Sequence, residues 1–162
     1  MEKSQSTINN LQRNRGITIF IAMVITGTLL LIATSLVNLA LKQSAISTSG
    51  RDSQLAFYAA DSGLECALYW DIQNPVGQSA FATSTGTTIN CNKDATNSLN
   101  QWVVGGTSVS TINKITFLPD QYCAIVTVTK NNDGTTKIES FGYNTCDTAN
   151  PRRVERAVRA SY

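Results

Sequence analysis

Residues 17–41 read ITIFIAMVITGTLLLIATSLVNLAL, and this stretch decides how the N-terminal third of the chain folds. Its 25 residues include no charged side chain. A helix rises about 1.5 Å per residue, so the stretch reaches ~37 Å, and the apolar core of a bilayer is ~30 Å thick. Length and composition therefore predict a helix that can cross a membrane.

The residues before this stretch are polar and carry a basic excess. Residues 1–16 hold Lys3, Arg13 and Arg15 against Glu2, and the rest of the chain holds ten basic and ten acidic residues. Short basic flanks stay in the cytoplasm, so we expect the N-terminus inside and the part after Leu41 exported. A secretory signal peptide is disfavoured because its apolar region runs only ~7–15 residues.

The helix is predicted to continue to about Trp70, a length of ~80 Å. No proline occurs between Lys42 and Asp71, and Gly50 within STSG predicts a kink. Apolar residues recur at three- and four-residue spacing, which makes this half amphipathic. The expected apolar stripe comprises Phe57, Ala60, Leu64, Ala67 and Leu68.

The C-terminal part is predicted to form a sheet that covers this stripe. Residues 73–100 read as a long loop with one short strand near Thr87–Asn90, and strands are expected at Val103–Ile112 and Lys114–Leu118. CAIVTVTK (123–130) and TTKIESFGY (135–143) flank Asp133-Gly134, which predicts a β-hairpin. A calcium site at Asn131–Asp133 is disfavoured because one carboxylate is too few.

The closing segment RRVERAVRASY (152–162) alternates as an edge strand does. Its four arginines are Arg152, Arg153, Arg156 and Arg159. They could bind phosphate, but a solvated strand face with charges that prevent edge pairing is the favoured interpretation, and nucleic acid is not the expected partner. The whole pattern predicts an α+β fold: a long N-terminal helix, half membrane-embedded and half amphipathic, on a small antiparallel sheet.

Four cysteines, Cys66, Cys91, Cys123 and Cys146, all follow the apolar stretch. An oxidising exported location favours two disulfides over zinc, since no C-x-x-C pair occurs. Three connectivities are possible, and Cys66–Cys91 with Cys123–Cys146 is preferred because it closes the shorter loops. Four buried free thiols are the alternative.

Histidine is absent from the sequence, which removes the commonest general base and metal ligand. No G-x-S-x-G or paired-carboxylate motif occurs, and Asp61-Ser62-Gly63 reads as helix surface. We therefore expect no catalytic residues, no metal site and no cofactor.

Two segments together resemble a known family. QRNRG (12–16) before the apolar helix, followed by RDSQLAFYAADSGLE (51–65), is similar to the N-terminal region of PilX-type minor pilins and tip pseudopilins. The resemblance implies a leader at 1–16, a filament-core helix at 17–41 and an exported domain at 42–162. It also implies cleavage by prepilin peptidase between Gly16 and Ile17, and N-methylation of Ile17.

The resemblance further implies a structural role in a type IV pilus or a type II secretion-like pseudopilus. The implied partners are other pilin subunits, prepilin peptidase and the inner-membrane assembly platform. The implied location is the cytoplasmic membrane, spanned once, and later a cell-surface filament. Major pilins carry a glutamate at the fifth mature residue, and Ile21 stands there, which favours a minor subunit.

Two other functions remain open from the sequence. An uncleaved single-pass anchor could carry an exported binding or adhesin domain, with contacts through the Trp102 and Gly105-Gly106 region or the 73–100 loop. An exported enzyme is the third hypothesis, and the missing catalytic motifs speak against it.

Overall fold

The computed structural model describes residues 15–73, 77–92, 100–119 and 121–162. The chain divides into two compact units, Met1–Ser47 and Thr48–Tyr162. Most of the leader expected at 1–16, including Arg13, lies outside the described residues. The first unit is helical in its described part, and the second holds the core.

Helix α2 runs from Arg15 to Leu68 and ends in a π-helical turn at Tyr69–Gln73. The predicted extent of the helix is confirmed. A weak point or kink was expected at Gly50, and the helix continues through this residue without a break. A single glycine costs a helix only about 1 kcal/mol, which is too little to end a helix of 54 residues.

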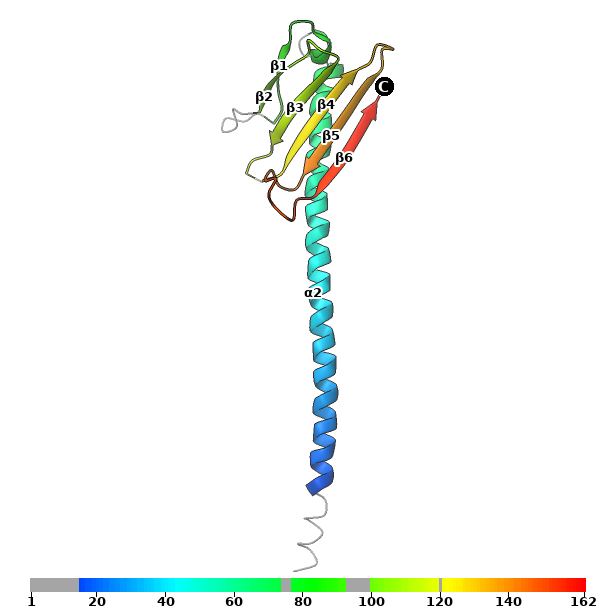
Figure 1. The fold of residues 1–162 in the computed structure, drawn as a ribbon, viewed down its shortest axis with the longest axis vertical. Helices are drawn as coiled ribbons and strands as arrows, with labels where there is room; N and C mark the ends of the chain where they lie inside the picture. Colours follow the sequence, from blue (N-terminus) through cyan, green and yellow to red (C-terminus); the bar gives the residue numbers. More distant parts are fainter. Residues whose placement is uncertain (1–14, 74–76, 93–99, 120) are drawn as a thin grey trace, which may run out of the picture. The chain divides into compact units, whose positions relative to one another are not determined.

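The second unit contains two antiparallel sheets. The larger one has the order β3-β4-β5-β6, and the smaller one pairs β1 with β2. Figure 1 shows the four strands of the larger sheet side by side across the C-terminal part of α2. The bounds are β1 Thr87–Asn90, β2 Gln101–Val104, β3 Val109–Thr116, β4 Cys123–Lys130, β5 Thr136–Tyr143 and β6 Glu155–Ser161. A short 3-10 turn, η2, spans Ala80–Ala82. The predicted α+β fold, a long N-terminal helix with a small antiparallel sheet, is confirmed.

The central hairpin forms as its sequence predicts. β4 and β5 pair from Cys123↔Tyr143 to Lys130↔Thr136 without a register shift. Asp133 accepts hydrogen bonds from the backbone and side chain of Thr135, and Gly134 takes φ +86°. The turn therefore uses the residue that tolerates a left-handed backbone.

The strand boundaries around residue 105 differ from the prediction. The expected strand 103–112 is divided, because β2 ends at Val104 and Gly105 and Gly106 both adopt positive φ. The expected separate strand at 114–118 is instead the end of β3, which crosses a bulge between Ile112 and Ile115. Alternating polarity does not reveal where a glycine pair turns the chain or where a bulge keeps a strand continuous.

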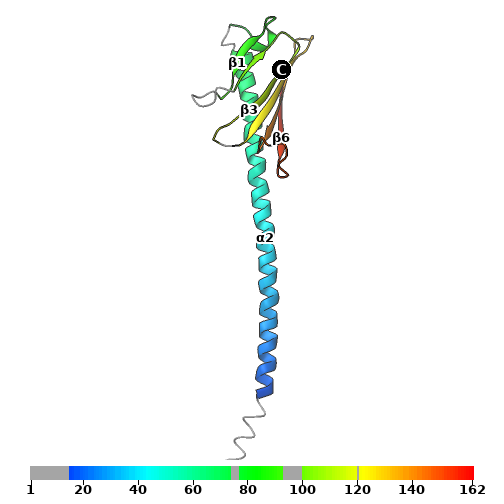
Figure 2. The same ribbon diagram turned by 60° about the vertical axis from the view of Figure 1, so that its left-hand side comes forward.

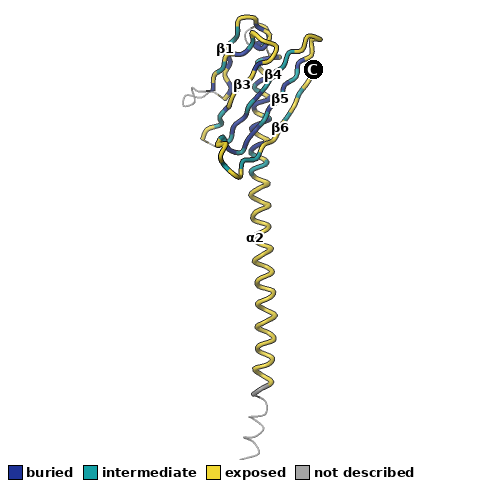
Figure 3. Tube along the Cα trace, in the orientation of Figure 1, coloured by how far each residue is buried: buried dark blue, intermediate teal, exposed yellow. Residues whose placement is uncertain are grey.

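The core lies between one face of the larger sheet and one side of α2. In Figure 2 the sheet is turned towards its edge and the helix covers a single face, and Figure 3 shows buried residues on the strands and on the helix where they meet. Phe57 was expected in this core, yet it is 48% exposed, whereas Ala56 and Ala59 are fully buried. Small side chains let the helix lie close to the strands, so the buried side is the alanine side.

Candidate functional site

The proposed processing site lies at the start of α2. Gly16 is the second residue of the helix, and Ile17 follows with 61% of its surface exposed. Every residue from Ile17 to Gly50 is exposed within the chain. By length and composition this helix could cross a membrane, with a mean hydropathy of 2.4 over its most apolar window. A surface this apolar requires either lipid or other apolar helices around it.

The hydroxyl groups within this apolar stretch bond to their own helix. Thr26 donates to the Ala22 carbonyl at 2.8 Å, and Ser35 donates to the Leu31 carbonyl at 2.9 Å. Thr28 and Thr34 donate to carbonyls three residues earlier. These bonds satisfy the hydroxyls without water, so the stretch can lie in lipid or in a packed helix bundle.

The C-terminal part of α2 meets β5 at very short range. A Cβ on Gly142 would overlap the carbonyl oxygen of Ala56 and the backbone of Ala60. On the helix, a Cβ at Gly63 would lie 2.6 Å from Ser140 Oγ and 2.9 Å from Val126 Cγ2. The alanines and the glycine of AFYAADSG (56–63) therefore form the helix face that packs against the sheet. The expectation that Gly63 lies on the helix surface is wrong.

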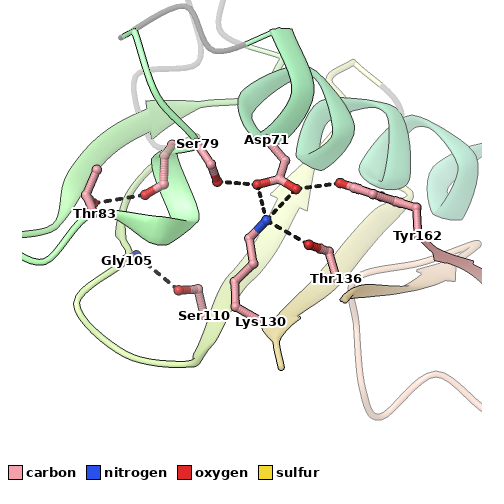
Figure 4. Close-up of polar contacts among 9 residues, drawn as sticks. Asp71, Ser79, Thr83, Gly105, Ser110, Lys130, Thr136 and Tyr162 are labelled. Atoms are coloured by element: carbon pink, nitrogen blue, oxygen red, sulfur yellow. Dashed lines mark hydrogen bonds and ion pairs between the residues drawn. The ribbon is translucent and has the colours of Figure 1, made fainter. Parts of the chain in front are cut away.

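A buried carboxylate fastens the end of this helix to two strands. Asp71, only 5% exposed, pairs with Lys130 of β4, whose Nζ lies 2.6 Å from Oδ1 and 2.7 Å from Oδ2. Ser79 and Tyr162 also donate to the carboxylate, and Lys130 donates to Thr136 Oγ1 at 2.8 Å. Figure 4 shows these side chains converging on Asp71 from the helix end, the loop and the sheet.

The charge state of this cluster follows from competing effects. Burial disfavours the Asp71 carboxylate, but the bonds from Lys130, Ser79 and Tyr162 outweigh burial and lower its pKa. Burial and the bond to Asp71 raise the pKa of Tyr162. The cluster is therefore an ion pair with a neutral phenol, and it holds elements together rather than performing proton transfer.

One predicted disulfide is formed. Cys66, half-buried near the C-terminal end of α2, bonds to Cys91, with a Cα–Cα distance of 5.8 Å. The indole of Trp70 donates to the Asn90 carbonyl at 2.9 Å beside it. Together the two contacts fasten the end of β1 to the C-terminal end of the helix.

The second expected disulfide, Cys123–Cys146, is not formed. Cys123 is buried at the start of β4, Cys146 is half-buried, and both are free thiols. Burial and the neighbouring Cys146 thiol raise the pKa of Cys123 to about 12. The pairing was predicted from loop length alone. A disulfide also requires a suitable distance and orientation of the two cysteine side chains, which loop length does not determine.

The arginines of the closing segment do not gather into one patch. Arg153 stacks on the Tyr143 ring at 3.7 Å, and Arg156 Nε donates to Ser53 Oγ on the helix at 2.8 Å. Arg152 and Arg159 are exposed. Within the described residues, no group of three or more His, Cys, Asp or Glu side chains could hold a metal ion.

Sequence reasoning did not anticipate the Asp71 cluster or the Gly142 contact. Asp71 is separated from Lys130 by 59 residues and from Tyr162 by 91. No local pattern links positions so far apart. A glycine inside a β-rich run was the one available signal for Gly142, since such a glycine often marks a close backbone approach.

Comparison with known proteins adds one finding. Residues 15–65 match the family model described as PilX N-terminal, a range that contains the apolar stretch and the small-residue face of α2. No curated protein and no solved structure matches the chain. The matched family is a structural family of type IV pilus minor pilins rather than an enzyme family. Residues 15–65, about a third of the chain, are therefore similar to the N-terminal region of PilX-type minor pilins.

Proposed function

We propose that this chain is a minor structural subunit of a type IV pilus or a type II secretion-like pseudopilus. The observation that carries the proposal is the charge-free stretch at 17–41, which is exposed within the chain at every residue and lies inside the PilX N-terminal match. Such a surface is stable in lipid before assembly and among other apolar helices afterwards. The sheet domain would face outward.

Processing at the start of α2 is the first step of the proposed pathway. Prepilin peptidase on the cytoplasmic side would cut between Gly16 and Ile17, and the new amine of Ile17 would be methylated. The chain would span the cytoplasmic membrane once, with its N-terminus inside, until the assembly platform extracts it. Other pilin subunits would then contact it through α2.

Ile21 supports the minor role within this proposal. A carboxylate at the fifth mature position neutralises the amine of a neighbouring major pilin, and Ile21 offers no such charge. A buried carboxylate in lipid costs several kcal/mol unless it is paired. The apolar side chain therefore eases residence in the membrane and removes one docking contact, which suits a subunit present in few copies.

The N-terminus of the mature protein tests the proposal. The full chain would be co-expressed with a prepilin peptidase that is shown to process a known prepilin in the same cells. Mass spectrometry should find a chain that begins with methylated Ile17. The matched variant Gly16→Val should keep its leader, because a side chain there would obstruct the peptidase, and Gly27→Val within the same helix should still be cut.

An intact leader on the unmodified chain would refute the subunit role. That result would favour the single-pass anchor, in which α2 stays in the membrane and the exported unit binds a ligand. A chain that is cut between Gly16 and Ile17 but lacks the methyl group would confirm the cleavage and contradict only the proposed methylation.

A further inference from the structure

A polar hollow lies where three segments of the unit Thr48–Tyr162 meet. Its volume is about 480 Å³, and ligand sites in proteins usually measure ~300–1,000 Å³. The walls come from the end of η2 and the residues after it (81–84), the turn before β3 (106–108) and the β4–β5 turn (130–132 and 134–136). We call this space the turn pocket. Figure 4 shows Thr83 from the first wall, and Lys130 and Thr136 from the third.

Hydrogen bonds between main-chain groups hold the three walls of the turn pocket together. Gly106 N donates to the Thr83 carbonyl at 2.6 Å, which joins the second wall to the first. Lys130 N donates to the Ser108 carbonyl at 2.7 Å, which joins the third wall to the second. Walls that are already fixed lose little conformational freedom when a ligand binds. The turn pocket is therefore a preformed site.

The lining of the turn pocket carries no free charge. Among the described residues that line it, Lys130 alone is charged. Its ammonium pairs with Asp71 and donates to Thr136 Oγ1, so its charge is neutralised and its N–H groups are already bonded. Asp133 belongs to the same turn but does not line the pocket, and its carboxylate accepts hydrogen bonds from Thr135. The pocket therefore suits a neutral ligand better than an anion or a cation.

Three polar side chains, one from each wall, are available to a ligand. Ser84, Ser108 and Asn132 are exposed, and none of them has a hydrogen-bond partner within the part of the chain that the structure describes. A hydroxyl and a primary amide can each both donate and accept. Phe81 and Ala82 add an apolar area to the same pocket. This combination matches a sugar ring, which presents hydroxyl groups at its rim and C–H groups on its faces.

We propose that the turn pocket binds a neutral saccharide, whose hydroxyl groups bond to Ser84, Ser108 and Asn132 and whose C–H groups lie against Ala82. This binding is an activity in addition to the proposed structural role. It does not depend on cleavage, because every residue that carries it lies within 81–136.

Two other ligand classes fit the turn pocket less well. A phosphate or sulfate group needs uncompensated positive charge, and Lys130 is already paired with Asp71. An extended peptide is recognised largely through main-chain hydrogen bonds. The main-chain N–H groups of Gly106, Lys130, Asn131 and Gly134 already donate to carbonyls within the chain. Side-chain hydroxyl and amide groups are what the pocket has left to offer.

Saturation-transfer NMR on the full chain in phosphatidylcholine nanodiscs tests the proposal, with empty nanodiscs as the blank. The neutral probes are the methyl glycosides of glucose, galactose, mannose and N-acetylglucosamine, and the charged probes are glucose 6-phosphate and sialic acid. At least one neutral probe should bind more tightly than both charged probes. Ser84→Ala and Asn132→Ala should each raise its Kd about fivefold, the equivalent of ~1 kcal/mol for one hydrogen bond. Ser108→Trp should fill the pocket and abolish binding.

Matched variants outside the turn pocket serve as controls. Thr148→Ala removes a hydroxyl and Asn113→Ala removes an amide from exposed positions, and both should leave the Kd unchanged. Formation of the Cys66–Cys91 bond reports folding of every variant. The proposal is overturned if no neutral probe binds, if a charged probe binds more tightly, or if the pocket variants behave like the controls. The N-terminus of the same samples tests the proposed function separately, since the pocket should bind with or without residues 1–16.

Discussion

Gly142 of β5 lies so close to Ala60 of α2 that a side-chain carbon on this glycine would overlap the helix backbone. Among the glycines of the described residues, Gly142 makes the closest contact between the helix and the sheet. It explains why small residues occupy the buried side of the helix, and it makes a direct prediction about stability.

Gly142→Ala should destabilise the unit Thr48–Tyr162 by about 3 kcal/mol or more, because the backbone of the helix and of the strand leaves no room for relaxation. Unfolding of the full chain by urea in detergent micelles, followed through Trp70 and Trp102, measures the change. Gly50→Ala is the matched control. Nothing lies within 4 Å of a Cβ at this helical position, so it should be neutral or stabilise by up to ~1 kcal/mol. Equal stability of both variants would contradict the close packing.

The Asp71–Lys130 pair predicts an asymmetric response to mutation. Asp71→Asn leaves the Lys130 ammonium without its anion and should cost about 3 kcal/mol. Replacing both residues, Asp71→Asn with Lys130→Met, should cost less than the single change, because no buried charge remains unpaired. The same urea experiment measures both variants. A double variant that is less stable than Asp71→Asn would show that the lysine contributes beyond its ion pair.

Stability should fall in acid, and Asp71 should account for part of the loss. Its pKa is lowered on folding from an ordinary value of 3.8, so the folded chain keeps the carboxylate ionised where the unfolded chain protonates it. The stabilisation is present above pH 3.8 and is lost as pH falls through the lower folded pKa. Urea midpoints at about pH 7 and about pH 3 should differ less in Asp71→Asn than in the unmodified chain. Identical differences would exclude Asp71 as a contributor.

The two free thiols should differ in reactivity. The pKa of Cys123 is raised to about 12, so its reactive thiolate is scarce at neutral pH. Iodoacetamide should therefore modify Cys146 in the folded chain and reach Cys123 only after unfolding. Peptide mass spectrometry without reductant identifies the labelled residue. Cys66 and Cys91 serve as the internal control, because bonded sulfurs should stay unlabelled. Failure to label either free thiol after unfolding would mean that they had formed a bond.

Local pattern was sufficient for several elements. The extent of α2, strand β1 at Thr87–Asn90, the β4–β5 hairpin and the closing strand were all predicted from residue spacing and turn residues. These features depend on neighbours a few positions apart. The Cys66–Cys91 bond was also preferred correctly, because it closes one of the shorter loops.

The sequence by itself determined that an uncharged helix begins near Ile17 and that a sheet follows it, since both depend on periodic apolar patterns. The apolar spacing also predicted most of the buried side of the helix, because Ala60, Leu64 and Ala67 are buried. Only the tertiary structure decided that Ala56 and Ala59 belong to that side and that Phe57 does not. It also brought Asp71 to Lys130 and Tyr162, and left Cys123 and Cys146 as free thiols. The physical reason is distance along the chain. Contacts between residues far apart in sequence depend on how the helix and the sheet pack, and the local spacing of residues does not determine that packing.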